Sequence, residues 1–557
     1  MAEQQKSHEK NFLVQGSILA IAGVITKIIG LIYRIPLMNI VGDEGMGYYS
    51  VAFSIYTVAL MLTSYSLPLA VSKLVSERMA LGQHKNAYKV FKGALAFAVI
   101  AGGITSLLIF FGADFIASTM MSMDLSAYAL RVLGPCILIV ALLGVFRGFF
   151  QGMGSMVPTA ISQVLEQIVN AIASVAGAYM LLQAGKNVAK QMNDKSYSSA
   201  YAAAGGTIGT IAGAFFALLL LIAIYFAYKK VLKRQMRRDR TKKSESYQLI
   251  FKILLATIVP VILSATVYNI SDFLDSAIFN KIMAVQGYSK VEYASLLGMF
   301  SGQFTTLVNV PTSISSALAA SLIPTLVTTA QTGSRKQIHG KIYTVTRFTM
   351  LLAIPCAVGF LVLAKPILDL LFYTQDNSKP ALMLQIGAIS VVFFCLSTVT
   401  TAVIQGLDDM ITPVKNSAIA LVVHVVALIL MMVVFRWNIY AVVMSKTIFA
   451  LVNTILNDHT LRMQVGYVQE SRRTFVIPVI ASAVMGVVAL VVHLLFELFA
   501  GEKIATVIAV LVAVVTYAVT LVLIGGVTEA EMKEMPMGNK LISICKKLHL
   551  LRVGENK

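Results

Sequence analysis

Long apolar runs separated by short polar segments form the dominant pattern of this chain. A helix of about 20 predominantly apolar residues is long enough to cross the hydrocarbon core of a bilayer. Applied along the chain, this length predicts fourteen transmembrane helices, near residues 13–38, 47–72, 88–112, 125–150, 158–183, 201–228, 249–281, 294–327, 341–364, 380–405, 413–435, 438–461, 474–499 and 503–526. The pattern therefore predicts an all-α polytopic membrane protein.

Composition and charge support this class and give the chain an orientation. Hydrophobic residues make up 57% of the 557 residues and charged residues only 13%, which excludes an ordinary soluble protein. The formal net charge of +19 would suggest a nucleic-acid partner in a soluble chain, but here the basic residues fall mostly in alternate short loops. This positive-inside pattern instead predicts a multi-pass protein of the cell membrane, with both termini in the cytoplasm and no nucleic-acid partner.

A weak internal repeat divides the chain into two halves. The pair Gln151-Gly152 recurs as Gln405-Gly406, and each pair is followed by a proline. Six predicted helices precede the strongly basic segment Lys229 to Lys243, so both copies have the same orientation in the membrane. The predicted parts are an N-lobe of six helices, a basic cytoplasmic linker, a C-lobe of six helices, an extra helix pair and a cytoplasmic amphipathic tail, at residues 1–228, 229–248, 249–461, 474–526 and 527–557.

The first predicted span carries two cations, Lys27 and Arg34, in an otherwise apolar helix. Seven residues correspond to about two helical turns, so both side chains lie on one face. A cation at the bilayer centre costs roughly 2.5–3.5 kcal/mol, and it persists where the helix faces a water-filled cavity or an anion. The pair predicts an anion-accepting cavity. Alternatively, Arg34 extends to the interface or pairs with Asp43 or Glu44.

Polar side chains within other spans form further candidate binding positions. They recur at helical spacing in spans 5 and 7, and a third group lies in span 8. Spans 1 and 7 are equivalent in the two repeats, so cations and carboxylates are expected to face each other across a cavity between the lobes. The alternative is that the carboxylates of span 7 pair with Lys27 or with a serine. The candidate substrate-binding residues, besides Lys27 and Arg34, are Gln163, Glu166, Asn170, Asn269, Asp272, Asp275, Gln303 and Asn309.

Other motifs limit the possible chemistry. Two glycine stripes, Gly144/Gly148/Gly152 and Gly205/Gly209/Gly213, indicate close helix packing. The four cysteines have no paired spacing, so neither a disulfide framework nor a metal site is expected. No nucleotide-binding loop is evident, and no histidines cluster with acids at ligand spacing. The chain is therefore predicted to be a transporter that is not an enzyme and has no cofactor.

Several motifs resemble the multidrug/oligosaccharidyl-lipid/polysaccharide exporter superfamily, called here the MOP superfamily. The likeness covers nearly the whole length and is strongest to the polysaccharide-exporter branch, which includes the stage V sporulation protein B type and the MurJ-like lipid II flippases of Gram-positive bacteria. The residues that carry it are Ile25-Thr26-Lys27-Ile28-Ile29-Gly30, Val41-Gly42-Asp43-Glu44-Gly45, Leu67-Pro68-Leu69-Ala70-Val71-Ser72-Lys73, the Gln151-Gly152 and Gln405-Gly406 turns, Asn309-Val310-Pro311 and Ser321-Leu322-Ile323-Pro324.

The resemblance implies two lobes around a cationic cavity that accepts the pyrophosphate and sugar of an undecaprenyl-linked precursor. It assigns the cation role to Lys27, where better-studied relatives carry arginine. Arg34 lies one residue after the next family arginine, whose position is occupied here by Tyr33, and the family arginine of span 8 has no equivalent. Asp275 resembles an acid that binds Na⁺ in some members. Spans 13 and 14 would border a groove for the lipid tail.

The predicted function is therefore a flippase for a lipid-linked cell-wall precursor, lipid II first, in the bacterial cell membrane. Alternating access would be driven by the membrane potential or by a Na⁺ or H⁺ gradient. The expected partners are the lipid-linked oligosaccharide and membrane lipids, and the expected state is a monomer. The alternatives are an exporter of a teichoic, capsular or sporulation glycan precursor, a cation-coupled multidrug exporter, and a scaffold of an assembly complex without transport.

Overall fold

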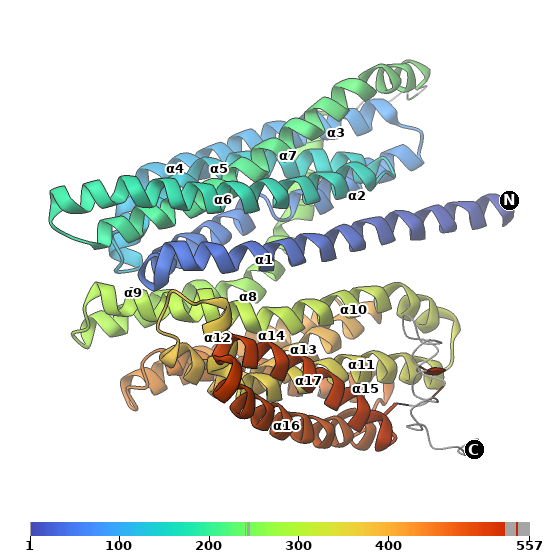
Figure 1. Cartoon of the computed structure of the whole chain (residues 1–557). Coiled ribbons are helices and arrows are strands. Elements are labelled where there is room, and N and C mark those ends of the chain that lie inside the picture. The colour runs from blue at the N-terminus through green and yellow to red at the C-terminus, as the bar shows by residue number, and fades with distance from the viewer. Residues whose placement is uncertain (1, 240, 242–244, 528, 530–541, 544–557) are drawn as a thin grey trace. The chain divides into compact units, whose positions relative to one another are not determined.

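The computed structural model of the chain describes residues 2–239, 241, 245–527, 529 and 542–543. Throughout this part, every regular element is a helix (Figure 1). In order, the elements are α1 (Ala2–Thr63), α2 (Leu67–Ala80), α3 (His84–Phe97), η1 (Ala98–Gly102), α4 (Gly103–Phe115), η2 (Ile116–Met120), α5 (Ser126–Gly152), α6 (Val157–Met192), α7 (Ser196–Arg238), α8 (Tyr247–Val285), α9 (Lys290–Gly298), η3 (Met299–Phe304), α10 (Thr305–Thr332), α11 (Arg335–Val362), α12 (Ala364–Leu371), α13 (Ser378–Gly406), α14 (Thr412–Val433), α15 (Ile439–Val465), η4 (Arg472–Val476), α16 (Ile477–Ala500) and α17 (Glu502–Leu523). The η elements are π-helical turns. The predicted all-α class is confirmed.

The predicted membrane class is also confirmed, because eleven helical stretches of the described residues are long and apolar enough to cross a bilayer. The first of them, Ile21–Ala80, contains two predicted spans, since α1 continues from one into the next. Predicted spans 7 and 8 coincide with α8 and with α9 to α10, which are not among the eleven. The count of fourteen therefore stays a prediction.

A kink at Gly42 separates the two predicted spans within α1. The dihedral angles of this residue, φ 75° and ψ 174°, are outside the helical region. Glycine adopts them at little cost because it has no Cβ. The sequence predicts a loop of several residues between positions 38 and 47, whereas the structure turns the chain at this single residue.

The described chain forms two compact units. Unit 1 comprises Met1–Thr306 together with Leu428–Val442, and unit 2 comprises Leu307–Ala427 together with Val443–Lys557. The sequence repeat places the division between lobes at the basic linker, residues 229–248. By compactness, α8, α9 and η3 instead group with α1 to α7.

The two predicted glycine stripes lie at close helix contacts, which confirms their packing role. A Cβ added at Gly205 of α7 would lie 2.2 Å from the carbonyl oxygen of Gly177 in α6. A Cβ added at Gly148 of α5 would lie 2.6 Å from the carbonyl oxygen of Pro68 in α2. The helix backbones approach so closely that no larger residue fits without a shift.

Replacing Gly205 by valine is therefore expected to force α6 and α7 apart and to destabilise unit 1. Overpacking of this kind typically costs about 1–3 kcal/mol. Gly103→Val in α4 is a matched control, because a Cβ at Gly103 meets no heavy atom within 4 Å. Thermal unfolding of the detergent-purified variants measures the difference. Equal melting temperatures for the two variants would contradict the packing role.

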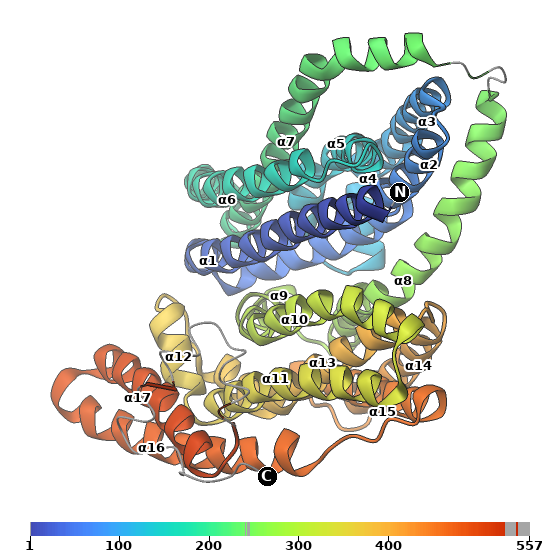
Figure 2. The same ribbon diagram turned by 90° about the vertical axis from the view of Figure 1, so that its right-hand side faces the viewer.

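The segment that follows α7 is attached to the turn between α2 and α3. Helix α7 curves away from α6 near its end (Figure 2) and includes the first ten residues of the predicted linker, 229–238. Beyond it, the backbone amide of Lys85 donates to Asp239 over 2.6 Å, and the guanidinium of Arg78 lies 2.9 Å from the carboxylate of Glu245. Burial alone would raise the pKa of Asp239, but hydrogen bonds from Lys85 and Thr241 outweigh it and hold this pKa below its usual value.

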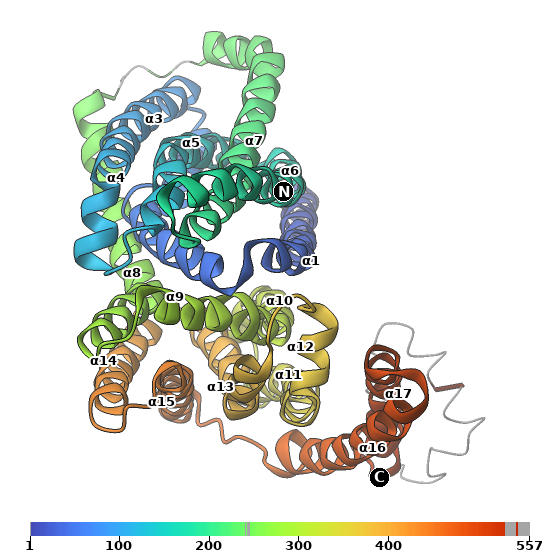
Figure 3. The ribbon, with the colours of Figure 1, turned by 60° about the vertical axis from the view of Figure 1, so that its left-hand side comes forward.

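In unit 2, α11 packs on α13 and on α16, and α16 packs on α17. Figure 3 shows α16 and α17 as a helix pair beside α11 and α12. The residues of the predicted extra pair, 474–526, fall in η4, α16, α17 and the turn that follows them. The predicted amphipathic tail lies outside the described residues, apart from positions 527, 529, 542 and 543.

Candidate functional site

Lys27 lies in the apolar part of α1 before the kink at Gly42, and its side chain is exposed. It takes part in none of the ion pairs between residues that the structure describes. The predicted alternative, a salt bridge from Lys27 to a carboxylate of span 7, is therefore not formed. Arg34, two turns further on, is partly buried and close enough to Tyr49 to interact electrostatically with its hydroxyl. Both cations thus lie in unit 1, where α1 packs on α6.

The second alternative, pairing of Arg34 with the nearby acids, also differs from the observed contacts. The carboxylate of Glu44 accepts hydrogen bonds from the hydroxyl of Tyr48 over 2.8 Å and from the hydroxyl of Ser199 over 2.9 Å. Ser199 belongs to α7, so Glu44 ties α1 to α7. The acid at this kink therefore has a structural partner other than Arg34.

The predicted polar stripe of α6 contains an ion pair that the sequence analysis missed. The guanidinium Nη2 of Arg147, in α5, donates to Oε2 of Glu166 over 2.6 Å, and its Nε donates to the hydroxyl of Ser162 over 3.0 Å. Both charged side chains are largely buried, with exposures of 15% for Arg147 and 25% for Glu166. The signal was available, because Arg147 is a charge inside an apolar span, as Lys27 is.

The same stripe of α6 reaches α1 through Asn170. Its side-chain amide donates to the hydroxyl of Tyr33 over 3.3 Å, and its carbonyl oxygen accepts from Ser174 over 3.0 Å. Asn170 is only 8% exposed, whereas Gln163, two turns before it, is partly buried. The structure therefore brings α1, α5 and α6 together around a row of polar groups. Of these three helices, α1 is the one that carries Lys27 and Arg34.

The candidates from spans 7 and 8 have different surroundings. In α8, the side chain of Asp272 is exposed, and that of Asp275 is only 2% exposed. The side chain of Asn269 is outside what the structure describes. Gln303 is fully buried in the π-helical turn η3, a type of distortion that is frequent at functional sites. Asn309, in α10, is exposed and belongs to unit 2.

Unit 2 holds a buried amide network that the sequence analysis also missed. The side-chain amide of Asn416, in α14, donates to Asn457 of α15 over 2.9 Å. Asn457 in turn donates to Thr400 and Thr401 of α13, and Asn453 donates to Ser397 over 2.6 Å. These hydrogen bonds join three membrane helices in a setting where unpaired polar groups are costly. The spacing of Asn453 and Asn457, one helical turn, was the available signal.

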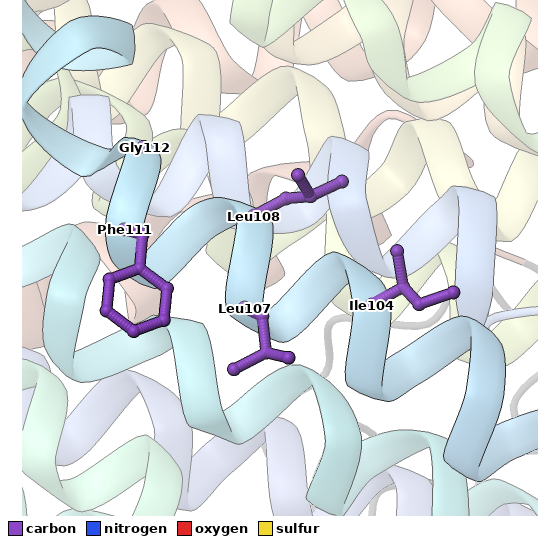
Figure 4. Close-up of a pocket in the computed structure, with 5 residues that line it drawn as sticks. All are labelled: Ile104, Leu107, Leu108, Phe111 and Gly112. Atoms are coloured by element: carbon purple, nitrogen blue, oxygen red, sulfur yellow. The ribbon is translucent and has the colours of Figure 1, made fainter.

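A surface hollow on α4 does not have the chemistry of a headgroup site. Its lining residues are Ile104, Leu107, Leu108, Phe111 and Gly112 (Figure 4). All of these side chains are apolar, and the four large ones are exposed. A face of this kind suits contact with lipid chains, whereas a phosphate needs cations or hydrogen-bond donors. Within the described residues, no three His, Cys, Asp or Glu side chains are grouped so that they could hold a metal ion.

Long apolar helices with buried polar groups between them define a polytopic membrane protein. Residues 12–330 match the family described as polysaccharide biosynthesis protein, and the chain belongs to this family. It is 25% identical over 530 residues to the lipid II flippase MurJ of Bacillus subtilis (strain 168), a match that covers 91% of this chain and 94% of that protein. It is also 27% identical over 416 residues to stage V sporulation protein B of the same organism, covering 74% and 76%.

Solved structures show the same fold at low sequence identity. A lipid II flippase MurJ in an inward closed conformation superposes with a TM-score of 0.62 at 15% identity, covering 90% of this chain and 97% of that one. An inward-facing multidrug resistance MATE transporter of the MOP superfamily superposes with a TM-score of 0.59 at 16% identity, covering 79% and 94%. The resemblance to the MOP superfamily is thus confirmed, and the chain stands among transporters and flippases, which are not catalytic enzymes.

Proposed function

We propose that this protein is a flippase that moves an undecaprenyl-pyrophosphate-linked cell-wall precursor, lipid II first, across the bacterial cell membrane. The observation that carries the proposal is Lys27, an exposed cation in an apolar helix of unit 1 that forms no ion pair with any residue the structure describes. The names of two relatives, the lipid II flippase MurJ and stage V sporulation protein B, support the substrate class. A buried or membrane-embedded cation is retained where it meets an anion, and a pyrophosphate is such an anion.

The proposed cycle is alternating access by a monomer with both termini in the cytoplasm. The pyrophosphate binds at Lys27 from the cytoplasmic side, with Arg34 and the polar row of α6 contacting the rest of the headgroup. Rearrangement of the two lobes then exposes the headgroup to the outside, while the lipid tail stays in the membrane along α16 and α17. The candidates Asn269, Asp272, Gln303 and Asn309 are proposed to contact the sugars.

The membrane potential is a sufficient driving force for this direction of movement. A pyrophosphate carrying about two negative charges gains roughly 2.3 kcal/mol per charge per 100 mV when it moves outward across an inside-negative membrane. The sum, about 4–5 kcal/mol, corresponds to about three orders of magnitude in the equilibrium constant for outward movement. Coupling to Na⁺ or H⁺ is an additional route, for which the buried carboxylate of Asp275 would supply an oxygen ligand.

A second candidate function is cation-coupled export of drugs, favoured by the buried Asp275 and by the fold shared with a MATE transporter. Growth of a strain depleted of its own lipid II flippase separates the two functions. Lipid II flipping predicts that this chain restores growth and that Asp275→Asn leaves at least part of the rescue. Failure to rescue, combined with increased drug tolerance that Asp275→Asn abolishes, would instead establish the drug exporter. Rescue confined to a sporulation or teichoic acid defect would identify another lipid-linked glycan as the cargo.

A further inference from the structure

The helix pair α16–α17 is joined to α11 by two hydrogen bonds that both end on backbone carbonyls. Tyr517 of α17 donates its hydroxyl to the carbonyl of Leu351 over 2.9 Å. Arg347 of α11 donates through Nη2 to the carbonyl of Gly526 over 2.6 Å. All four residues belong to unit 2, so these contacts lie within one compact body. Neither bond was expected from the sequence.

The backbone carbonyl of Leu351 has no hydrogen-bond donor within α11, because the residue four positions after it is a proline. In a regular helix this oxygen would accept from the amide of residue 355, but residue 355 is proline and has no N–H. Inside a membrane, an unsatisfied carbonyl costs several kcal/mol, and no water is available to bond it. The hydroxyl of Tyr517 fills the vacant position. The break in α11 and the tyrosine in α17 are therefore complementary parts of one contact.

Gly526 presents its carbonyl for a related reason, because it follows the end of α17. Gly525 adopts φ 70°, and the amide of Gly526 returns to the carbonyl of Leu521 over 2.7 Å, which closes the helix in a Schellman turn. The chain reverses here, beyond the ladder of helical hydrogen bonds. Arg347 is only 3% exposed and also donates to the hydroxyl of Tyr343 over 2.8 Å. Its guanidinium thus fixes the exit from α17 to the core of unit 2.

Apolar packing surrounds both bonds. The ring of Tyr517 packs against two clusters, one with Met485, Ala489, Ala509 and Ala513, the other with Ala481 and Leu521. A Cβ added at Gly486 of α16 would lie 2.9 Å from a methyl group of Val358 in α11. The helices therefore meet closely, but burial of apolar surface adds little driving force between membrane helices, because lipid tails are equally apolar. Directional hydrogen bonds are what can fix the register.

We propose that Tyr517 and Arg347 are positioning residues, which lock α16–α17 to α11 so that the pair and α11 move as one rigid body. Pro355 is part of the lock, because it creates the acceptor that Tyr517 fills. During a transport cycle, the pair would keep its place on α11 and would not open from it as a lid. The lock belongs to the helix pair and does not depend on the identity of the cargo.

Two cysteines placed at the contact between α11 and α16 can measure how often the pair leaves α11. Val358→Cys with Gly486→Cys, in a chain whose four native cysteines are replaced, places one thiol on α11 and one on α16 at contact distance. Tyr517→Phe is expected to speed modification of the two reduced thiols by a small maleimide about fivefold, because the thiols react while the pair is away from α11 and one ordinary hydrogen bond favours the docked state by that factor. Tyr179→Phe, a change at an exposed tyrosine of α6, is the matched control and is expected to leave the rate unchanged.

A double substitution distinguishes the lock from general loss of packing. Pro355→Ala restores an amide that can bond to the carbonyl of Leu351, so Tyr517→Phe is expected to have little further effect in that background. An equal effect of Tyr517→Phe in both backgrounds, or none in either, would overturn the assignment. At the other bond, Arg347→Lys retains a donor and is expected to keep more of the protection of the thiols than Arg347→Met, which has no donor. Equal rates for these two variants would remove Arg347 from the lock.

Transport by the cross-linked protein tests the rigid-body statement, and this step rests on the proposed function. The oxidised Val358→Cys/Gly486→Cys protein is expected to flip a lipid-linked pyrophosphate as fast as its reduced form. Inactivity that reduction reverses would show that the pair must leave α11, which overturns the rigid body. An inactive reduced form beside an active parent chain would mean that the two cysteines are unsuitable. Slower transport by Arg347→Met than by Arg347→Lys would then support the lock, and equal transport by these two variants would overturn it. Inactivity of the parent chain itself would count against the proposed function only, because the thiol-modification rates are measured without transport.

Discussion

Replacing Lys27 by alanine is expected to reduce outward movement of the lipid-linked precursor by a factor on the order of 10 to 100. A hydrogen bond to a charged group contributes about 1.5–3 kcal/mol, which corresponds to this range in an equilibrium constant. The side chain is exposed and has no ion pair in the described part of the chain, so the substitution leaves no carboxylate without a partner. The loss should therefore appear in transport and hardly in the thermal stability of the protein.

The loss can be measured in cells depleted of their own lipid II flippase, as the amount of precursor that is accessible at the outer surface. Lys27→Arg should retain most of the activity, because it keeps the positive charge and adds donors that suit a phosphate. Lys186→Ala, at an exposed lysine near the other end of α6, is the control for a general change in charge. Full activity of Lys27→Ala would show that no phosphate is held there. Equal losses for the alanine and arginine variants would show that the exact side chain matters for a reason other than charge.

Replacing Arg147 by alanine is expected to give the largest loss of stability among single substitutions in unit 1. Removing one partner of a buried ion pair typically costs about 3–5 kcal/mol, because the other charge stays without compensation. Glu166 is 25% exposed, so the cost should be near the lower end of that range. The substitution also removes the hydrogen bond to Ser162, which leaves two polar groups of α6 without their partner in α5.

The matched test removes both charges together. Arg147→Met combined with Glu166→Leu is expected to recover most of the thermal stability, since apolar pairs often replace buried ion pairs with little net cost. Melting temperatures in detergent, measured without substrate, give the comparison. A double variant as unstable as Arg147→Ala would mean that the pair itself, and not an uncompensated Glu166, holds α5 to α6. Arg147→Lys should be intermediate, because it keeps the charge but not the second donor.

The helices were predictable from the sequence because their signal is local, whereas their partners were not. Apolar length alone indicates where α5, α6 or α13 must run, and glycine spacing indicates where the backbones approach. The partner of Glu166 could not be predicted, because Arg147 lies on a different helix. Only the packing of α5 on α6 brings the two side chains together. The hydrogen bond from Tyr517 to Leu351 is hidden in the same way. Pro355 indicates that a backbone carbonyl lacks its helical partner, but nothing in the sequence indicates which side chain donates to it.

Two local predictions, the loop between the first two spans and the basic linker, differ from the structure. A polar loop was expected between the first two spans, but one glycine at φ 75° is enough to turn the chain, so α1 is continuous around Gly42. Asp239 and Glu245 lie in the segment predicted as a basic cytoplasmic linker, a prediction that indicates no tertiary contact for either residue. In the structure they anchor that segment to the α2–α3 turn. Charge composition describes such a segment on average, and individual contacts depend on what lies next to it.

The central claim is that this chain carries a pyrophosphate-linked lipid outward across a membrane. Reconstituting the purified protein in vesicles loaded with a fluorescent undecaprenyl-pyrophosphate-linked sugar, with and without an imposed inside-negative potential, tests it most directly. We expect protein-dependent appearance of the headgroup outside, faster with the potential applied and slowed in Lys27→Ala by a factor on the order of 10 to 100. Headgroups that stay inside in the presence of folded protein and an applied potential would contradict the claim.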